Sequence, residues 1–223
     1  MRHKGLGVVF VMVLLALPAC GTEDGREAVS LEPHSLELED ASGSIPDAYG
    51  ETYLKAVDGN GSDSTVYSLI YLDDDDIPEL VALDRGDDSY SVYTVRDGEL
   101  FCVADSLVTV EMTYYERSGV FAAFSRWNGG GDEGGYGYSY YQISGDQTIT
   151  EETQPILSFS YNAIYNEEGA YTGQGVTDYF HMGREVDEAS YREAQAGLGI
   201  VDGEGRPCIE NGCSKEEIIE LLK

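Results

Sequence analysis

Between residues 65 and 150 the chain consists of short runs rich in Val, Tyr, Phe, Thr and Ile, separated by turn signals. Only a few residues join one run to the next, too few for the crossover helix that parallel strands require. Asp97-Gly98 is typical of a two-residue hairpin turn, because glycine adopts positive φ at little cost. The pattern predicts an antiparallel meander with strands near 65–72, 79–84, 89–96, 99–105, 108–116, 120–127, 136–144 and 147–150.

Helical patterns flank this meander at both ends. Pro46 stands in the first turn of a segment with apolar residues at helical spacing, which are Tyr49, Tyr53, Leu54 and Val57. Asp187 is placed to cap a short helix over 188–196. Ser214 and Glu217 form a capping box before a last amphipathic helix. We predict an α+β fold in which the meander forms a curled sheet or a partly open barrel, with N- and C-terminal helices against it.

The N-terminus predicts export and lipidation. A basic start, residues 1–4, precedes a run of apolar residues over 5–17. As a helix this run would cover roughly 20 Å, short of the ~30 Å membrane core, so it reads as a signal peptide. Leu17-Pro18-Ala19-Cys20 resembles a bacterial lipobox, although Pro18 departs from the usual small residue. The resemblance implies cleavage of residues 1–19 and lipidation of Cys20.

Residues 20–44 predict a disordered tether between the lipid and the folded part. The segment is acidic, poor in aromatic residues and dotted with Gly, Ser and Pro. A single globular domain is expected to follow over 45–223. The expected location is the extracytoplasmic face of the cell membrane, where acyl chains hold the protein durably.

The charge balance restricts the partners. The chain has 42 Asp and Glu against 13 Lys and Arg, a net charge of −29. Such a surface repels nucleic acid and anionic polymers and concentrates cations. We therefore expect no nucleic-acid partner; the expected partners are the membrane, through the lipid, and an extracellular ligand.

Three cysteines remain after lipidation. Exported proteins keep disulfides, and turn residues separate Cys208 from Cys213, so the sequence leaves a Cys208–Cys213 bridge open. The alternative is two free thiols, because so short a loop gains little entropy and its geometry is restrictive. Cys102 lies in an apolar run and is expected to be a small buried hydrophobe.

The acidic segment 73–79 is the most distinctive motif. It resembles the calcium loop of FG-GAP repeats, with Asp73, Asp75 and Glu79 at acidic positions of that pattern. Tyr71 stands where the family has its first Asp, and Asp76 replaces the glycine of the turn. Alternating carboxylates can converge on a hard cation. The resemblance implies a calcium site at Asp73, Asp75 and Glu79, against the alternative of a solvated acidic turn.

A second resemblance covers most of residues 45–195. It rests on the acidic segment and on three softer stretches, which are Val92-Tyr93-Thr94, Tyr114-Tyr115-Glu116-Arg117 and 179–186. Together they resemble a group of uncharacterised surface lipoproteins of gut Firmicutes. The resemblance implies a surface lipoprotein and names no activity.

The segment 127–138 is rich in glycine and carries aromatic side chains. Trp and Tyr faces pack on sugars, and glycines allow close approach. We interpret it either as a loop that binds a carbohydrate or protein ligand, or as a plain hairpin loop.

Enzymatic patterns are missing from the sequence. No Gly-x-Ser-x-Gly, His-Glu-x-x-His or Ser-x-x-Lys occurs. We expect a noncatalytic, lipid-anchored binding or structural protein with no cofactor other than, at most, calcium. The alternative is an envelope hydrolase that uses paired carboxylates, because any of the acids can meet in the fold.

Overall fold

Eleven strands and three helices make up the part of the chain that the computed structural model describes, which is residues 47–59, 62–128, 134–201 and 204–223. These residues belong to one compact unit spanning 43–223. The predicted signal peptide, Cys20 and the whole of the predicted tether 20–44 lie outside the described residues.

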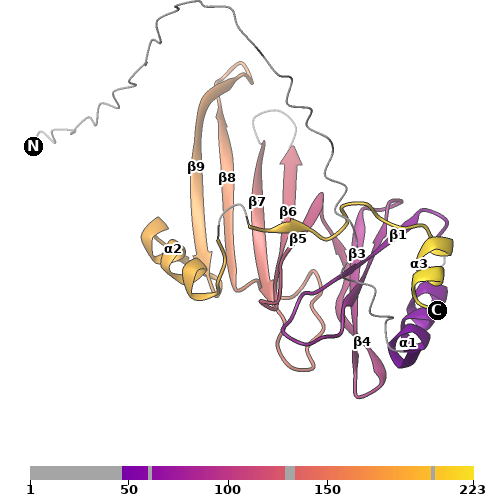
Figure 1. Ribbon diagram of the computed structural model, residues 1–223. Helices are drawn as coiled ribbons and strands as arrows, with labels where there is room; N and C mark the ends of the chain where they lie inside the picture. The colour runs from indigo at the N-terminus through magenta and orange to yellow at the C-terminus, as the bar shows by residue number, and fades with distance from the viewer. Residues whose placement is uncertain (1–46, 60–61, 129–133, 202–203) are drawn as a thin grey trace, which may run out of the picture. The chain divides into compact units, whose positions relative to one another are not determined.

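The first sheet is a four-stranded antiparallel meander (Figure 1). Its strands follow one another in sequence order: β1 (Thr65–Ile70), β2 (Glu79–Asp84), β3 (Ser89–Arg96) and β4 (Glu99–Val108). The turn between β3 and β4 has positive φ at both Asp97 and Gly98. Two successive positive φ values match the twist of antiparallel strands, which confirms the hairpin expected there.

The second sheet has seven antiparallel strands in the order β10-β9-β8-β7-β6-β5-β11. They are β5 (Glu111–Tyr115), β6 (Val120–Asn128), β7 (Gly134–Gln142), β8 (Leu157–Tyr165), β9 (Tyr171–His181), β10 (Arg184–Val186) and β11 (Arg206–Pro207). From β5 to β10 each strand pairs with the next in sequence, so the meander continues. Neither sheet closes into a barrel.

The chain passes from one sheet to the other at Thr109 and Val110. Val108 still pairs with Ser89 of the first sheet, whereas Glu111 already pairs with Phe124 of the second. The Thr109 hydroxyl donates to the carbonyl oxygens of Glu111 and Phe124 and so stabilises the corner. The predicted single strand 108–116 is therefore wrong in its first residues, and one curled sheet is replaced by two open ones.

Side chains of both sheets share one hydrophobic core. The first sheet contributes Val81, Val92 and Val103, and the second contributes Met112 and Phe121. Because side chains alternate along a strand, the neighbours of these residues point the other way. On the second sheet those neighbours form a separate face, and this face carries the candidate site described below.

Three helices cover the outer faces. α1 (Asp47–Gly59) and α3 (Lys215–Leu221) lie side by side on the first sheet (Figure 1), where Val57 and Ile218 are fully buried. The predicted capping box of Ser214 and Glu217 is confirmed. α2 (Glu188–Gly197) lies against β8 and β9 and has the predicted Asp187 cap. Among the described residues, no helix has the length and apolar character needed to span a membrane.

In the second half of the chain one strand prediction is wrong and one hairpin was missed. Residues 147–150 form no strand; Ile149 makes a single parallel bridge with Ala104. The long hairpin of β8 and β9 was not expected. In its outer half, Ile164, Tyr171 and Val176 are exposed. A strand without a buried face need not alternate apolar and polar residues, so the sequence pattern did not predict it. The α+β class and the antiparallel meander are confirmed.

Candidate functional site

The acidic segment forms the connection between β1 and β2. Carboxylate oxygens of Asp73, Asp75 and Glu79 lie within 4.8 Å of one another, so the structure brings together the three residues predicted from the motif. Glu79 is fully buried at the start of β2, Asp73 is half-buried and Asp75 is exposed. The group is thus open to solvent on one side.

Backbone amide groups of the loop already occupy these carboxylates. Asp73 accepts from the Asp75 amide at 3.1 Å, and Asp75 accepts from the Ile77 amide at 2.7 Å. Glu79 accepts from the Leu72 amide at 2.7 Å and from the Thr94 hydroxyl at 3.3 Å. The two Asp bonds are typical of Asp in tight turns, and the Glu79 bonds connect the start of β2 to the loop and to β3. Together they explain the loop without a cation.

Burial and the negative charge of neighbouring carboxylates both raise the pKa of Glu79. Burial raises the pKa of Glu79 to about 7, and the negative charges of Asp73 and Asp75 add to the rise while the Leu72 amide opposes it. Although Asp75 is exposed as a whole, partial desolvation of its carboxyl group raises its pKa, and its acidic neighbours add to the rise while the Ile77 amide opposes it. A cation would relieve this repulsion, but calcium takes six to eight oxygen ligands, roughly, and three carboxylates supply only part of that set.

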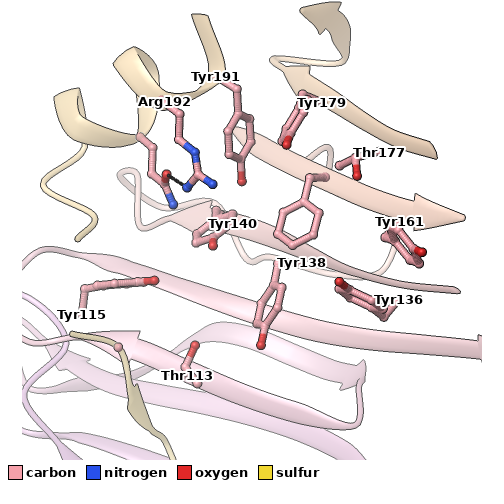
Figure 2. Close-up of a pocket in the computed structure, with 13 residues that line it drawn as sticks. Thr113, Tyr115, Tyr136, Tyr138, Tyr140, Tyr161, Thr177, Tyr179, Tyr191 and Arg192 are labelled. Carbon is pink, nitrogen blue, oxygen red and sulfur yellow. Dashed lines mark hydrogen bonds between the residues drawn. The ribbon is translucent and has the colours of Figure 1, made fainter. Parts of the chain in front are cut away.

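A hollow lies on the outer face of the second sheet, with a volume of about 490 Å³. We call it the tyrosine groove. Its lining residues come from β5, β7, β8, β9, α2 and the segment before β11, as Figure 2 shows. They are Thr113, Tyr115, Tyr136, Tyr138, Tyr140, Phe159, Tyr161, Thr177, Tyr179, Tyr191, Arg192, Gln195 and Gly205.

Strand periodicity and register produce the floor of this groove. In Gly-Tyr-Gly-Tyr-Ser-Tyr of β7 the tyrosines occupy every second position, so all three point to one face. Tyr138 is opposite Phe124 of β6 on one side and opposite Phe159 of β8 on the other. Phe159 is in turn opposite Tyr179 of β9. Four aromatic rings therefore form one row across four neighbouring strands. Tyr138, Phe159 and Tyr179 line the groove, whereas Phe124 is not among its lining residues.

Each ring of this aromatic row contacts the ring on the next strand. The row consists of Phe124, Tyr138, Phe159 and Tyr179. Their centroids are 4.8 Å apart from Phe124 to Tyr138, 5.6 Å from Tyr138 to Phe159 and 6.4 Å from Phe159 to Tyr179. These separations lie within the range of favourable ring contacts. The row is a continuous series of aromatic contacts, and all four of its rings are half-buried.

A second pair of aromatic side chains, Tyr136 and Tyr161, lies beside the row. Tyr136 and Tyr161 are opposite each other, and their rings stack at 5.1 Å with an interplanar angle of 28°. The ring of Tyr161 lies over Gly175, where a Cβ atom would meet it at 2.2 Å. Its hydroxyl forms a 2.8 Å hydrogen bond with that of Tyr171, which raises the pKa of Tyr161 to about 12. Glycine in β9 thus allows Tyr161 to lie flat.

Helix α2 closes one end of the groove. Tyr191 is buried against Phe159 and Tyr179. Arg192 donates to the Gln195 side chain at 3.0 Å and lies 3.8 Å from the Glu188 carboxylate. The positive charge at this end is therefore already balanced within the helix.

At the other end the groove continues into a second hollow of about 570 Å³, which shares Tyr136 and Tyr161 with it. Residues 129–133 of the predicted 127–138 binding loop lie outside the described residues. The described remainder belongs to β6 and β7, and Trp127 lies over Gly135, on the face opposite Tyr136 and Tyr138. Trp127 nevertheless borders the second hollow together with Tyr136 and Tyr161, so ligand binding by the segment 127–138 stays a prediction.

Sequence reasoning missed most of the groove. Of its aromatic lining only Tyr136 and Tyr138 lay in the predicted segment. The alternation of tyrosine with small residues in β7, repeated as Phe159-Ser-Tyr161 in β8, was the signal for one aromatic face. The contributions of Tyr179 and Tyr191 depend on strand pairing and helix packing, which no local pattern reports.

The open alternative of a Cys208–Cys213 bridge is not realised. All three described cysteines are free thiols. Cys208 lies in the core between the sheets, whereas Cys213 packs in the cluster under α1 and α3. Cys102 is half-buried, and burial raises the pKa of its thiol to about 11. The pairing fails because the chain between Cys208 and Cys213 crosses from one core to the other.

Comparisons with family models, with curated proteins and with solved structures find no match to this chain.

Proposed function

We propose that this protein is a lipid-anchored, extracytoplasmic binding protein whose ligand site is the tyrosine groove. The observation that carries the proposal is the groove itself. Its volume falls in the range of ligand pockets, roughly 300 to 1,000 Å³, and aromatic rings with a few polar groups line it, as in most such sites. Tyrosine suits this role because its ring is apolar and its hydroxyl is polar.

The lining favours binding over hydrolysis. Among the described residues that border the groove there is no Asp, Glu, His or Cys. A hydrolase of the paired-carboxylate type needs two acids across the bound substrate, about 5 to 9 Å apart. Asp73, Asp75 and Glu79 meet in a different loop and are held by backbone amides. An envelope hydrolase remains the alternative, and hydrolysis of a bound ligand by the purified protein would support it.

The location follows from Cys20. Lipidation there, after removal of the signal peptide, would hold the protein at the outside of the membrane. The predicted tether, residues 20–44, would allow the groove to bind ligands at some distance from the membrane. A calcium ion at Asp73, Asp75 and Glu79 stays a separate prediction and is not needed for the groove.

The experiment uses the full chain in a detergent without a sugar headgroup, applied to arrays of soluble oligosaccharides and peptides. We expect capture of at least one array member by the wild type and its loss in Tyr138→Ala. The matched control is Tyr71→Ala, which removes a half-buried ring under Arg117, outside both hollows. Binding that survives Tyr138→Ala, or no binding at all, would reject the groove as a ligand site and favour a structural role.

A further inference from the structure

The aromatic row has the dimensions of a site for a chain molecule. Neighbouring strands are about 4.8 Å apart, so rings on four successive strands span roughly 14 Å. A pyranose ring is about as wide as one strand spacing, and the row therefore offers room for roughly three sugar rings. The second hollow extends the surface past Tyr136 and Tyr161.

The polar groups around the row are mostly uncharged. Thr113 and Thr177 contribute hydroxyls, Gln195 contributes a nearly buried amide, and the tyrosines add phenol groups. Hydroxyls both donate and accept hydrogen bonds, as sugar hydroxyls do. Arg192 is paired with Glu188 and Gln195, and Arg126 lies exposed beside Tyr136 at the far end. The centre of the groove thus matches an uncharged ligand.

The rest of the molecule works against charged polymers. A net charge of −29 repels a polyanion before it reaches the groove. A polycation would be attracted to the surface, and Glu111 lies opposite Phe124 at one end of the aromatic row, but the described lining of the groove itself has no carboxylate to hold it. The C–H bonds on the face of a pyranose carry partial positive charge and pack well on the negative face of an aromatic ring.

Building on the proposed function, we infer that the tyrosine groove binds a linear, uncharged oligosaccharide laid across strands β7 to β9. About three consecutive sugar rings pack on the aromatic row. Tyr138, near the middle of the row and in contact with rings on both sides, carries the central sugar. Tyr161 is a positioning residue, because its ring stacks on that of Tyr136 and holds it in place.

The test measures affinity by calorimetry on the full chain in the same detergent. The probes are hexasaccharides of glucose, mannose, xylose and galactose, each also tried from the disaccharide upward. We expect at least one series to bind, with affinity rising up to about three or four units and then levelling off. Tyr138→Ala should weaken binding about tenfold, Tyr138→Phe much less, and Tyr71→Ala not at all.

Charge and ligand class are decided by two further probes. A hexamer of galacturonic acid should bind at least about tenfold more weakly than the best neutral hexamer. Tighter, salt-sensitive binding of the uronate would overturn the inference of an uncharged ligand. Binding of a proline-rich peptide alone, lost in Tyr138→Ala, would also overturn it while leaving the groove as a ligand site. If no hexasaccharide binds, the inference is wrong.

Gly175→Ala tests the role of the stacked pair Tyr136 and Tyr161 without removing either ring. A Cβ atom at this position would meet the Tyr161 ring at 2.2 Å, so Tyr161 must move away from its place beside Tyr136. We expect weaker binding of the hexasaccharide and a changed near-ultraviolet circular dichroism spectrum. Gly197→Ala is the matched control, since a Cβ there meets no atom within 4 Å. Unchanged affinity in Gly175→Ala would remove Tyr161 from the site.

Discussion

Glu79 carries a fully buried carboxyl group among other titratable side chains. Asp73 and Asp75 face it from the loop, and the Tyr53 hydroxyl, which donates to the Pro78 carbonyl oxygen at 2.6 Å, approaches from α1. The pKa of Glu79 rises from 4.5 to about 7 on folding. The folded protein therefore holds this proton more tightly than the unfolded chain. Its contribution to stability is complete below pH 4.5 and is lost as the pH rises to about 7.

Glu79→Gln is expected to remove this pH dependence. The amide is neutral at every pH and still offers an oxygen to the Leu72 amide. Above pH 7 the variant should exceed the wild type in free energy of unfolding by up to about 3 kcal/mol, and the two should converge near pH 4.5. Urea unfolding from pH 4.5 to 8 in EDTA measures both curves. Parallel curves would show that Glu79 does not change its protonation in this range.

Calcium gives a second prediction for the same side chains. If Asp73, Asp75 and Glu79 bind the ion, millimolar calcium raises the Tm by several degrees, because a ligand of the folded state at about 100 times its Kd adds about 2.7 kcal/mol. Asp75→Asn should abolish the shift while keeping an oxygen for the Ile77 amide. Asp74→Asn is the neighbouring control. A Tm that neither calcium nor EDTA moves would mean an acidic turn without an ion.

The contact between α1 and α3 depends on a residue without a side chain. A Cβ atom at Gly50 would lie 2.0 Å from the Leu222 carbonyl oxygen, so the helices could not keep their present distance. Alanine is the better helix former by about 1 kcal/mol, yet Gly50→Ala should destabilise the protein, by about 1 to 3 kcal/mol.

Gly197 of α2 provides the opposite case. It has open space around its Cα, so Gly197→Ala should stabilise the protein by roughly 0.4 to 1 kcal/mol. Equilibrium unfolding in urea compares the two variants. A stabilising Gly50→Ala would mean that α1 and α3 pack less closely than in the structure.

For the molecule as a whole, the proposed lipid anchor at Cys20 is what would place the groove outside the membrane. Cys20→Ser should prevent lipidation, so that the protein leaves the membrane fraction and appears in the surrounding medium or periplasm. Cell fractionation, with mass spectrometry of the peptide that begins at residue 20, measures both effects. Wild-type membrane protein with an unmodified Cys20 would contradict lipidation.

Features set by neighbouring residues were predictable from the sequence. The Asp97-Gly98 turn, the Asp187 cap and the Ser214 box each depend on atoms a few positions apart. The short connections between successive strands are sufficient to require antiparallel pairing. The grouping of Asp73, Asp75 and Glu79 was likewise predictable, because one loop holds all three.

Only tertiary contacts decided the division into two sheets, the separation of Cys208 from Cys213 and the tyrosine groove. The row from Phe124 to Tyr179 forms because the registers of three strand pairs place one aromatic residue opposite the next. A shift of one residue in any pair would turn a ring to the other face. Register is set by burial between the sheets, which joins residues far apart in the chain, and short-range patterns therefore do not contain it.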